Sequence, residues 1–136
     1  MATCQWLKVA LADRKDAQLT IARSGDLYGC QLTLFVKVQS GGDPELIPDA
    51  QGNTSTDFMV SPNVRTIAAS KLNGADTAWL DVIVTVAQPA KLSGNIDFTA
   101  KLEIAGQPAS QTDNKIALKP GDDADAMHLG WEIDKP

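Results

Sequence analysis

Strict alternation of apolar and polar side chains over long segments is the feature that most limits how this chain can fold. The longest run covers residues 95–104, in which every second side chain is apolar. Its apolar members are Ile96, Phe98, Ala100, Leu102 and Ile104, and its polar members are Asn95, Asp97, Thr99, Lys101 and Glu103. Successive side chains of a β-strand point to opposite faces of the sheet, so this pattern predicts a strand with one buried face.

Other segments alternate in the same way and complete an all-β pattern. Residues 5–12 and 19–22 flank a polar turn at 13–16, which predicts a hairpin with a short loop. The remaining long alternating segments are 30–38, 78–86 and 127–133, and shorter strands are expected at 58–60, 64–69 and 116–118. Asp makes up 14 of the 17 acidic residues, and Asp favours turns over helix interiors. We therefore expect about nine strands and no long helix.

The chain of 136 residues has the length of one domain. Many short strands separated by turn signals are typical of a β-sandwich or a closed barrel. We interpret the chain as a single antiparallel β-sandwich, of jelly-roll or Greek-key type, that covers residues 1–136. Residues 40–56 are rich in Gly, Pro and small polar residues and form a long loop in this interpretation. Loops of this length are functional or mobile, and the sequence leaves both alternatives open.

The charge balance disfavours two classes of partner. The chain carries 17 acidic and 12 basic residues, which gives a net charge of −5. This balance disfavours binding to nucleic acid through a basic face, and equally binding to an anionic membrane. No signal peptide is evident at Met1, and no segment reaches the roughly 18 apolar residues of a membrane helix. We expect a protein that is cytoplasmic as synthesised or incorporated in a particle. Cys4 and Cys30 are expected to be free thiols, and a disulfide between them stays open.

Residues suited to catalysis are scarce. His128 is the only histidine, and it falls among the polar residues of the last alternating segment, where an exposed strand histidine is expected. No nucleophile elbow accompanies it, and Cys4 and Cys30 lack the spacing of a zinc site. We predict no catalytic residue, no bound cofactor and no enzyme activity. A hydrolase that uses His128 and Asp123 is a third functional hypothesis, after a structural protein and a ligand-binding module.

The sharpest polar feature is the acidic turn at residues 121–125. Its carboxylates belong to Asp122, Asp123 and Asp125, and carboxylate oxygens are the hard ligands that Ca²⁺ prefers. The spacing of an EF-hand is absent. These three residues are a candidate calcium site, and the alternative is a solvated acidic turn. Further ligands would come from the long loop and its end: Asp43, Asp49 or Asp57.

Three large apolar side chains fall on faces that are otherwise polar. Phe35 belongs to the segment 30–38, and Trp79 and Ile83 belong to the segment 78–86. A second sheet or a loop that covers this face is one explanation. The other is contact with another copy of the chain, because an exposed apolar patch on a soluble domain often marks an interface. We take Phe35, Trp79 and Ile83 as candidate interface residues.

Part of the chain resembles a known family. An N-terminal hairpin, the run Val82-Ile83-Val84-Thr85-Val86-Ala87-Gln88-Pro89 and the strand 96–104 together resemble the coat proteins of small RNA bacteriophages. Those coat proteins end in helices that clasp a dimer. The C-terminal part of this chain instead holds Pro120-Gly121 and a strand-like end. The likeness includes no specific motif, and no family is assigned on it.

The leading functional prediction is a non-catalytic, self-associating structural protein. Such a protein is a component of a larger assembly, for example a virus or phage particle or a secretion-type apparatus, with copies of itself or other assembly proteins as partners. The scarcity of catalytic residue types and the apolar side chains on polar faces favour this prediction. The alternative is a calcium-dependent carbohydrate- or ligand-binding β-sandwich module that uses the turn at 121–125. The long loop at 40–56 suits either function.

Overall fold

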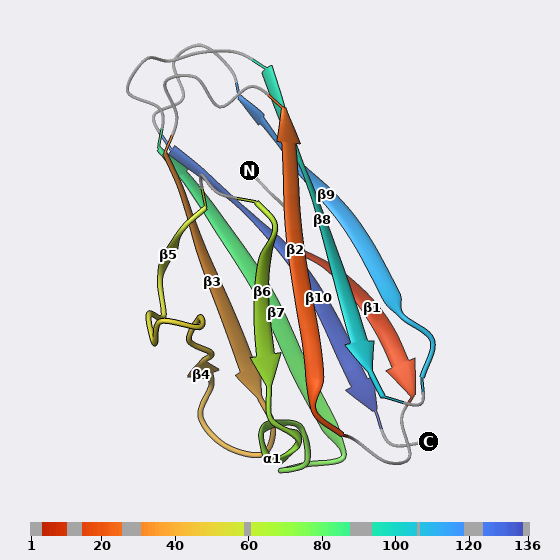
Figure 1. The fold of residues 1–136 in the computed structure, drawn as a ribbon. Coiled ribbons are helices and arrows are strands. Elements are labelled where there is room, and N and C mark those ends of the chain that lie inside the picture. The colour runs from red at the N-terminus through yellow and green to blue at the C-terminus, as the bar shows by residue number, and fades with distance from the viewer. Residues whose placement is uncertain are drawn as a thin grey trace.

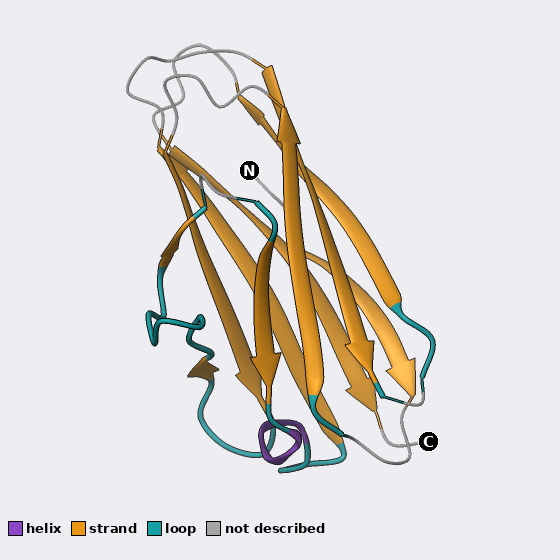
Figure 2. Cartoon of the chain, viewed as in Figure 1, coloured by secondary structure: helices purple, strands orange, loops and turns teal. Residues whose placement is uncertain are grey.

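The strands of the protein form two sheets that pack against each other (Figure 1). The computed structural model describes residues 4–10, 15–25, 31–58, 61–87, 94–105, 107–118 and 124–134. Within these ranges the single helix is the four-residue α1 (Ala69–Leu72), which lies at one end of the sheets (Figure 2). No helix of the described chain has the length and apolar character needed to cross a membrane. The all-β, sandwich-like architecture predicted from the alternation is confirmed.

Each sheet has a defined order of strands. The sheet that we call sheet A runs β1 (Cys4–Ala10), β10 (Ala124–Asp134), β7 (Thr77–Ala87), β3 (Gln31–Gln39) and β4 (Glu45–Leu46), with β5 (Thr56–Asp57) also paired to β3. Sheet B runs β6 (Asn63–Ile67), β2 (Ala17–Gly25), β8 (Gly94–Ile104) and β9 (Ser110–Leu118). All neighbouring pairs are antiparallel except β1 and β10, which are parallel.

The core lies between the sheets and follows the alternation in the sequence. In β8 the five apolar residues from Ile96 to Ile104 are at most 5% exposed, while their polar neighbours face outward. The inward faces of β3, β7 and β10 are buried in the same way. Trp131 of β10 is completely buried, and its indole Nε1 donates a hydrogen bond of 2.9 Å to Ser110 Oγ of β9. The two sheets are therefore joined by close packing and by a partly buried hydrogen bond.

The hairpin predicted for residues 5–12 and 19–22 is wrong. β1 lies at the edge of sheet A beside β10, with Lys8 opposite Glu132, whereas β2 lies in sheet B between β6 and β8. For β1 and β2 the alternation correctly predicted the face that is turned toward the core. It carries no information on which strand lies alongside, and here the chain crosses from one sheet to the other. The hairpin that contributed to the resemblance to phage coat proteins is thus absent.

The long loop predicted at 40–56 covers the edge of sheet A. It carries the two short strands β4 and β5, which both pair with β3. The backbone N–H of Ile47 donates to the Val36 carbonyl at 2.7 Å, and that of Phe58 donates to the Leu32 carbonyl at 3.0 Å. Phe58 itself lies in a turn and not in the expected strand 58–60, of which the remaining residues lie outside the described chain. The loop runs beside one side of the sandwich in Figure 1.

A buried arginine holds this loop against sheet B. Arg65 of β6 points inward and is 1% exposed. Its guanidinium donates to the Ile47 carbonyl at 2.5 Å, to Thr56 Oγ1 at 2.6 Å and to Asn63 Oδ1 at 3.1 Å. Burial lowers the pKa of Arg65 below its usual value, and the nearby carboxylate of Asp49 opposes this shift. Strand β6 thus presents a charged side chain to the interior, on the face where an apolar one is the rule.

Asp49 completes the network from within the loop. Its carboxylate accepts hydrogen bonds from the Thr56 hydroxyl at 2.7 Å, the Asn53 N–H at 2.9 Å and the Gln51 N–H at 3.0 Å. The Thr56 hydroxyl and then the Asn53 N–H hold the pKa of Asp49 below the ordinary value of 3.8. A carboxyl group with a lowered pKa stabilises the folded state above its unfolded pKa, and this contribution disappears as the pH falls through the folded pKa.

We expect Asp49→Asn to destabilise the protein at neutral pH and to have little effect in acid. An asparagine amide cannot accept the Thr56 hydroxyl hydrogen bond at its nitrogen, so the loop loses one anchor. Denaturant unfolding of the variant and the wild type at about pH 7 and at about pH 3 measures the difference, which should shrink toward the lower pH. An equal difference at both values contradicts this role of the ionised carboxylate.

Candidate interaction surface

The outer face of sheet A brings the three predicted interface residues together. Phe35 of β3 is directly opposite Ile83 of β7 in the register, and Trp79 lies on the same face of β7. Trp79 is 39% exposed, whereas Phe35 and Ile83 are half-buried. A fourth apolar residue, Leu46 of β4, is opposite Lys37 and is 44% exposed. We call these four residues the apolar patch. Leu46 escaped prediction because its segment shows no alternation.

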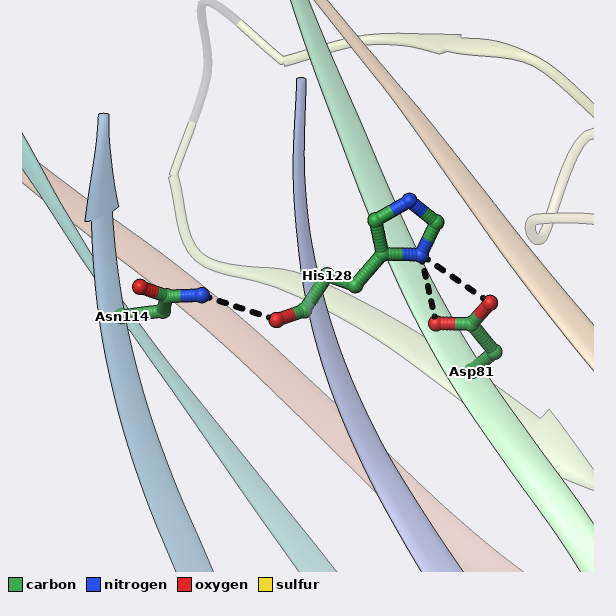
Figure 3. Close-up of polar contacts among 3 residues, drawn as sticks. All are labelled: Asp81, Asn114 and His128. Atoms are coloured by element: carbon green, nitrogen blue, oxygen red, sulfur yellow. Dashed lines mark hydrogen bonds and ion pairs between the residues drawn. The ribbon is translucent and has the colours of Figure 1, made fainter. Parts of the chain in front are cut away.

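A histidine–aspartate pair lies beside the apolar patch. Asp81 lies between Trp79 and Ile83 on β7 and is 7% exposed. Nδ1 of His128 on β10 is 3.2 Å from both Asp81 carboxylate oxygens (Figure 3). An ionised carboxylate only accepts hydrogen bonds, so Nδ1 carries the proton and donates. Gly130 is opposite Asp81 in the register and has no side chain, which leaves His128 a diagonal path to the carboxylate.

His128 contacts one strand of each sheet, β7 of sheet A through its ring and β9 of sheet B through its backbone carbonyl. Its side chain is 34% exposed, and Asn114 of β9 donates to its backbone carbonyl at 2.9 Å (Figure 3). The sequence predicted an exposed strand histidine, and it did not predict the Asp81 partner, because pairing across strands depends on the register.

Charges of both signs border the apolar patch. Lys37 of β3 and Asp81 of β7 are opposite each other in the register. On the other side of the face, the Lys8 ammonium is 3.3 Å from Glu132 Oε2, and the Lys8 side chain is 81% exposed. The outer face of sheet A therefore combines exposed apolar groups with carboxylates that already have a cationic or hydrogen-bonding neighbour.

The candidate calcium site falls mainly outside the described residues. Asp122 and Asp123 lie outside them, and Asp125 lies in β10 with its side chain outside the description. Asp49, one of the proposed further ligands, uses both carboxylate oxygens for contacts within the loop. Across the ranges that the structure covers, no three His, Cys, Asp or Glu residues are grouped to hold a metal ion. Calcium binding at the acidic turn stays a prediction.

An open hollow of about 470 Å³ lies on the outer side of β8 and β9. It is lined by Asp97, Phe98, Thr99, Asp113, Asn114 and Lys115. Asp97 and Lys115 are opposite each other in the register, so their charges offset. Asp113 adds a second carboxylate, so the lining carries a formal net charge of −1. Neither its shape nor its charge indicates a particular substrate.

Comparison with known proteins shows similarity of fold, to domains whose function is unknown. No family model and no curated protein matches the chain. A solved structure of a domain of unknown function, DUF4425, from Bacteroides vulgatus is similar, with a TM-score of 0.57 and 11% sequence identity. A DUF4425 family protein from Bacteroides ovatus has a TM-score of 0.54 and 7% identity. Each match covers 85% of this chain and 94% of the other. The chain shares its fold with these two domains.

Proposed function

We propose that the chain is a non-catalytic, self-associating structural protein, a component of a larger assembly such as a virus or phage particle or a secretion-type apparatus. The observation that carries the proposal is the apolar patch on the outer face of sheet A. Phe35 and Ile83 are in register on two central strands, and Trp79 and Leu46 extend the patch with exposures of 39% and 44%. Exposed patches of apolar groups with a polar border mark contact surfaces on soluble domains.

The charged groups on this face also suit contact with a protein. Covering an ionised group costs free energy unless it has a partner. Asp81 already receives a hydrogen bond from His128, and Glu132 has Lys8 at 3.3 Å. A second protein surface can therefore cover the face without stripping an isolated carboxylate of water. The proposal includes the location of the protein, which is cytoplasmic as synthesised or incorporated in a particle. It also includes the partners, which are copies of the chain or other assembly proteins.

Two finer assignments also stay proposals. A jelly-roll or Greek-key connection with about nine strands is supported by the repeated crossing of the chain between sheets from β1 to β8.

A calcium-dependent carbohydrate- or ligand-binding module remains the alternative function. Its test is a calcium titration of the melting temperature, because a ligand that binds only the native state must raise it.

We expect substitutions in the apolar patch to weaken self-association and to leave the fold intact. Trp79→Ser and Ile83→Ser each remove an apolar side chain from the face without opening the core. Light scattering coupled to size exclusion, at concentrations up to about 1 mM, detects even weak association. The matched control is Val64→Ser, because Val64 is 45% exposed on the outer face of sheet B. A wild-type protein that stays monomeric throughout this range contradicts the proposed function.

A further inference from the structure

The outer face of sheet A carries unlike residues at matching positions on β3 and β7. Lys37 of β3 is opposite Asp81 of β7, and Phe35 is opposite Ile83. Along the strand direction, the cation of β3 is therefore level with the carboxylate of β7. The aromatic ring of β3 is level with the aliphatic side chain of β7. Directly opposed residues share a face of the sheet, so all four lie on the outer side.

Lys37 has no counter-ion within the described part of its own chain. The Asp81 carboxylate, although opposite in the register, receives His128 Nδ1 at 3.2 Å from the far side. No ion pair joins the Lys37 ammonium to Asp81 within 4.0 Å, and Lys37 is nevertheless half-buried. A half-buried ammonium next to an apolar patch gains from a carboxylate supplied by another molecule.

A two-fold rotation turns this pattern into complementary contacts. Consider an axis parallel to the strands, outside sheet A and midway between β3 and β7. The rotation keeps each residue at its height along the strands and exchanges the two strands. β3 of one copy therefore faces β7 of the other. Lys37 meets Asp81 of the second copy and Phe35 meets Ile83 of the second copy, and each contact occurs twice.

The geometry of sheet packing permits this arrangement. Facing sheets pack about 10 Å apart, a distance that long and aromatic side chains span. Their strands cross at about 30°, which displaces residues near the axis only slightly. Trp79, opposite Gln39 in the register, then lies over Gln39 of the second copy. A two-fold contact of this kind is closed and self-complementary, as is usual for homodimers.

We propose that a second copy of this chain docks on the outer face of sheet A about a two-fold axis along the strands between β3 and β7, with Lys37 of each copy paired to Asp81 of the other. This inference rests on the proposed function and goes beyond it by naming the partner and the contacts. A different protein with complementary charges is the competing occupant, and the experiment separates the two.

Charge reversal on each side of the contact, followed by mixing, tests the proposal. In Lys37→Glu alone, both contacts join two carboxylates, and in Asp81→Lys alone both join two ammonium groups. Each variant is expected to dimerise at least about tenfold more weakly than the wild type, because like charges face each other. In an equimolar mixture each contact joins one carboxylate and one ammonium, so the mixture should associate again. Lys101→Glu, an exposed substitution on the outer face of sheet B, is the matched control.

Cysteine cross-linking provides a second measurement that does not depend on Asp81→Lys folding. In a Cys4→Ser, Cys30→Ser background, mixed Phe35→Cys and Ile83→Cys chains should be joined by a short bis-maleimide in preference to either homodimer, because sheets about 10 Å apart are too distant for a direct disulfide. Restored association on mixing, with the mixed cross-linked dimer, supports the proposal. A wild-type protein that associates but is insensitive to Lys37→Glu, with no preference for the mixed cross-link, overturns the docking mode and leaves the proposed function standing. A monomeric wild-type protein overturns both.

Discussion

Arg65→Ala is expected to lower the free energy of unfolding by about 3–5 kcal/mol, within the range found when a large buried side chain is replaced by alanine. The guanidinium is 1% exposed and donates three hydrogen bonds, to Ile47, Thr56 and Asn63. Alanine leaves the Ile47 carbonyl and the Asn63 amide oxygen without these donors, and it also leaves the space of a long side chain unfilled. Urea unfolding followed by tryptophan fluorescence measures the loss.

Two further substitutions separate the causes of this loss. Arg65→Met fills most of the volume without donating, and Arg65→Lys retains the charge but cannot reach three acceptors in a fixed fork. We expect Met to recover the part of the loss that comes from packing. Hydrogen exchange should show faster exchange of the Asn53 and Gln51 amides, because the Asp49 turn depends on Thr56. Lys101→Ala, on the exposed face of β8, is the control. A loss below about 1 kcal/mol for Arg65→Ala contradicts the role assigned to the arginine.

Trp131→Ala is the second substitution with a large expected effect, again about 3–5 kcal/mol. The indole is completely buried between the sheets, and its N–H donates to Ser110 Oγ at 2.9 Å. Removing it opens a cavity that the strands on both sides cannot close without moving. Trp131→Phe keeps most of the ring volume and loses the hydrogen bond, so it should cost about 1–3 kcal/mol.

Trp79→Ala is the matched control, because it removes the same side chain from the surface. Trp79 is 39% exposed on the outer face of sheet A. Its replacement should change the unfolding free energy of the dilute protein by less than about 1 kcal/mol. The two tryptophans thus divide the roles: one should govern stability and the other association. Equal losses of stability from both substitutions refute this division.

Local pattern predicted most of the secondary structure, because one buried face forces every second residue to be apolar. The strands β3, β7, β8 and β10 lie where the alternation placed them, and their inward residues are buried. Strand β6 is an exception to this alternation of buried apolar and exposed polar residues. Val64 points outward at 45% exposed and Arg65 points inward, because the loop supplies hydrogen-bond acceptors that the sequence does not reveal. A buried arginine and a solvated one look alike in a sequence.

Long-range pairing is what the pattern could not supply. The parallel contact of β1 with β10 and the position of β2 in sheet B depend on crossovers that leave no mark on local composition. For the same reason the sequence predicted that Asp81 and His128 each point outward, but it did not predict that they contact each other. The alternation predicted that Phe35, Trp79 and Ile83 point away from the buried face of their own strands, and they do. It did not predict that β3 and β7 are neighbours and bring these residues onto one face.

The parallel pairing of β1 with β10 bears on the order in which the chain can assemble. β1 is the first described strand to leave the ribosome and β10 is the last, so Cys4–Ala10 has no neighbour in sheet A until residues 128–134 have been made. Closing so long a loop is entropically costly, and contacts between distant residues slow folding. The remaining strands can pair before this step. During synthesis β1 is therefore an exposed strand with its hydrogen-bonding edges open, and its docking is the event that completes the outer face on which the proposed dimer forms.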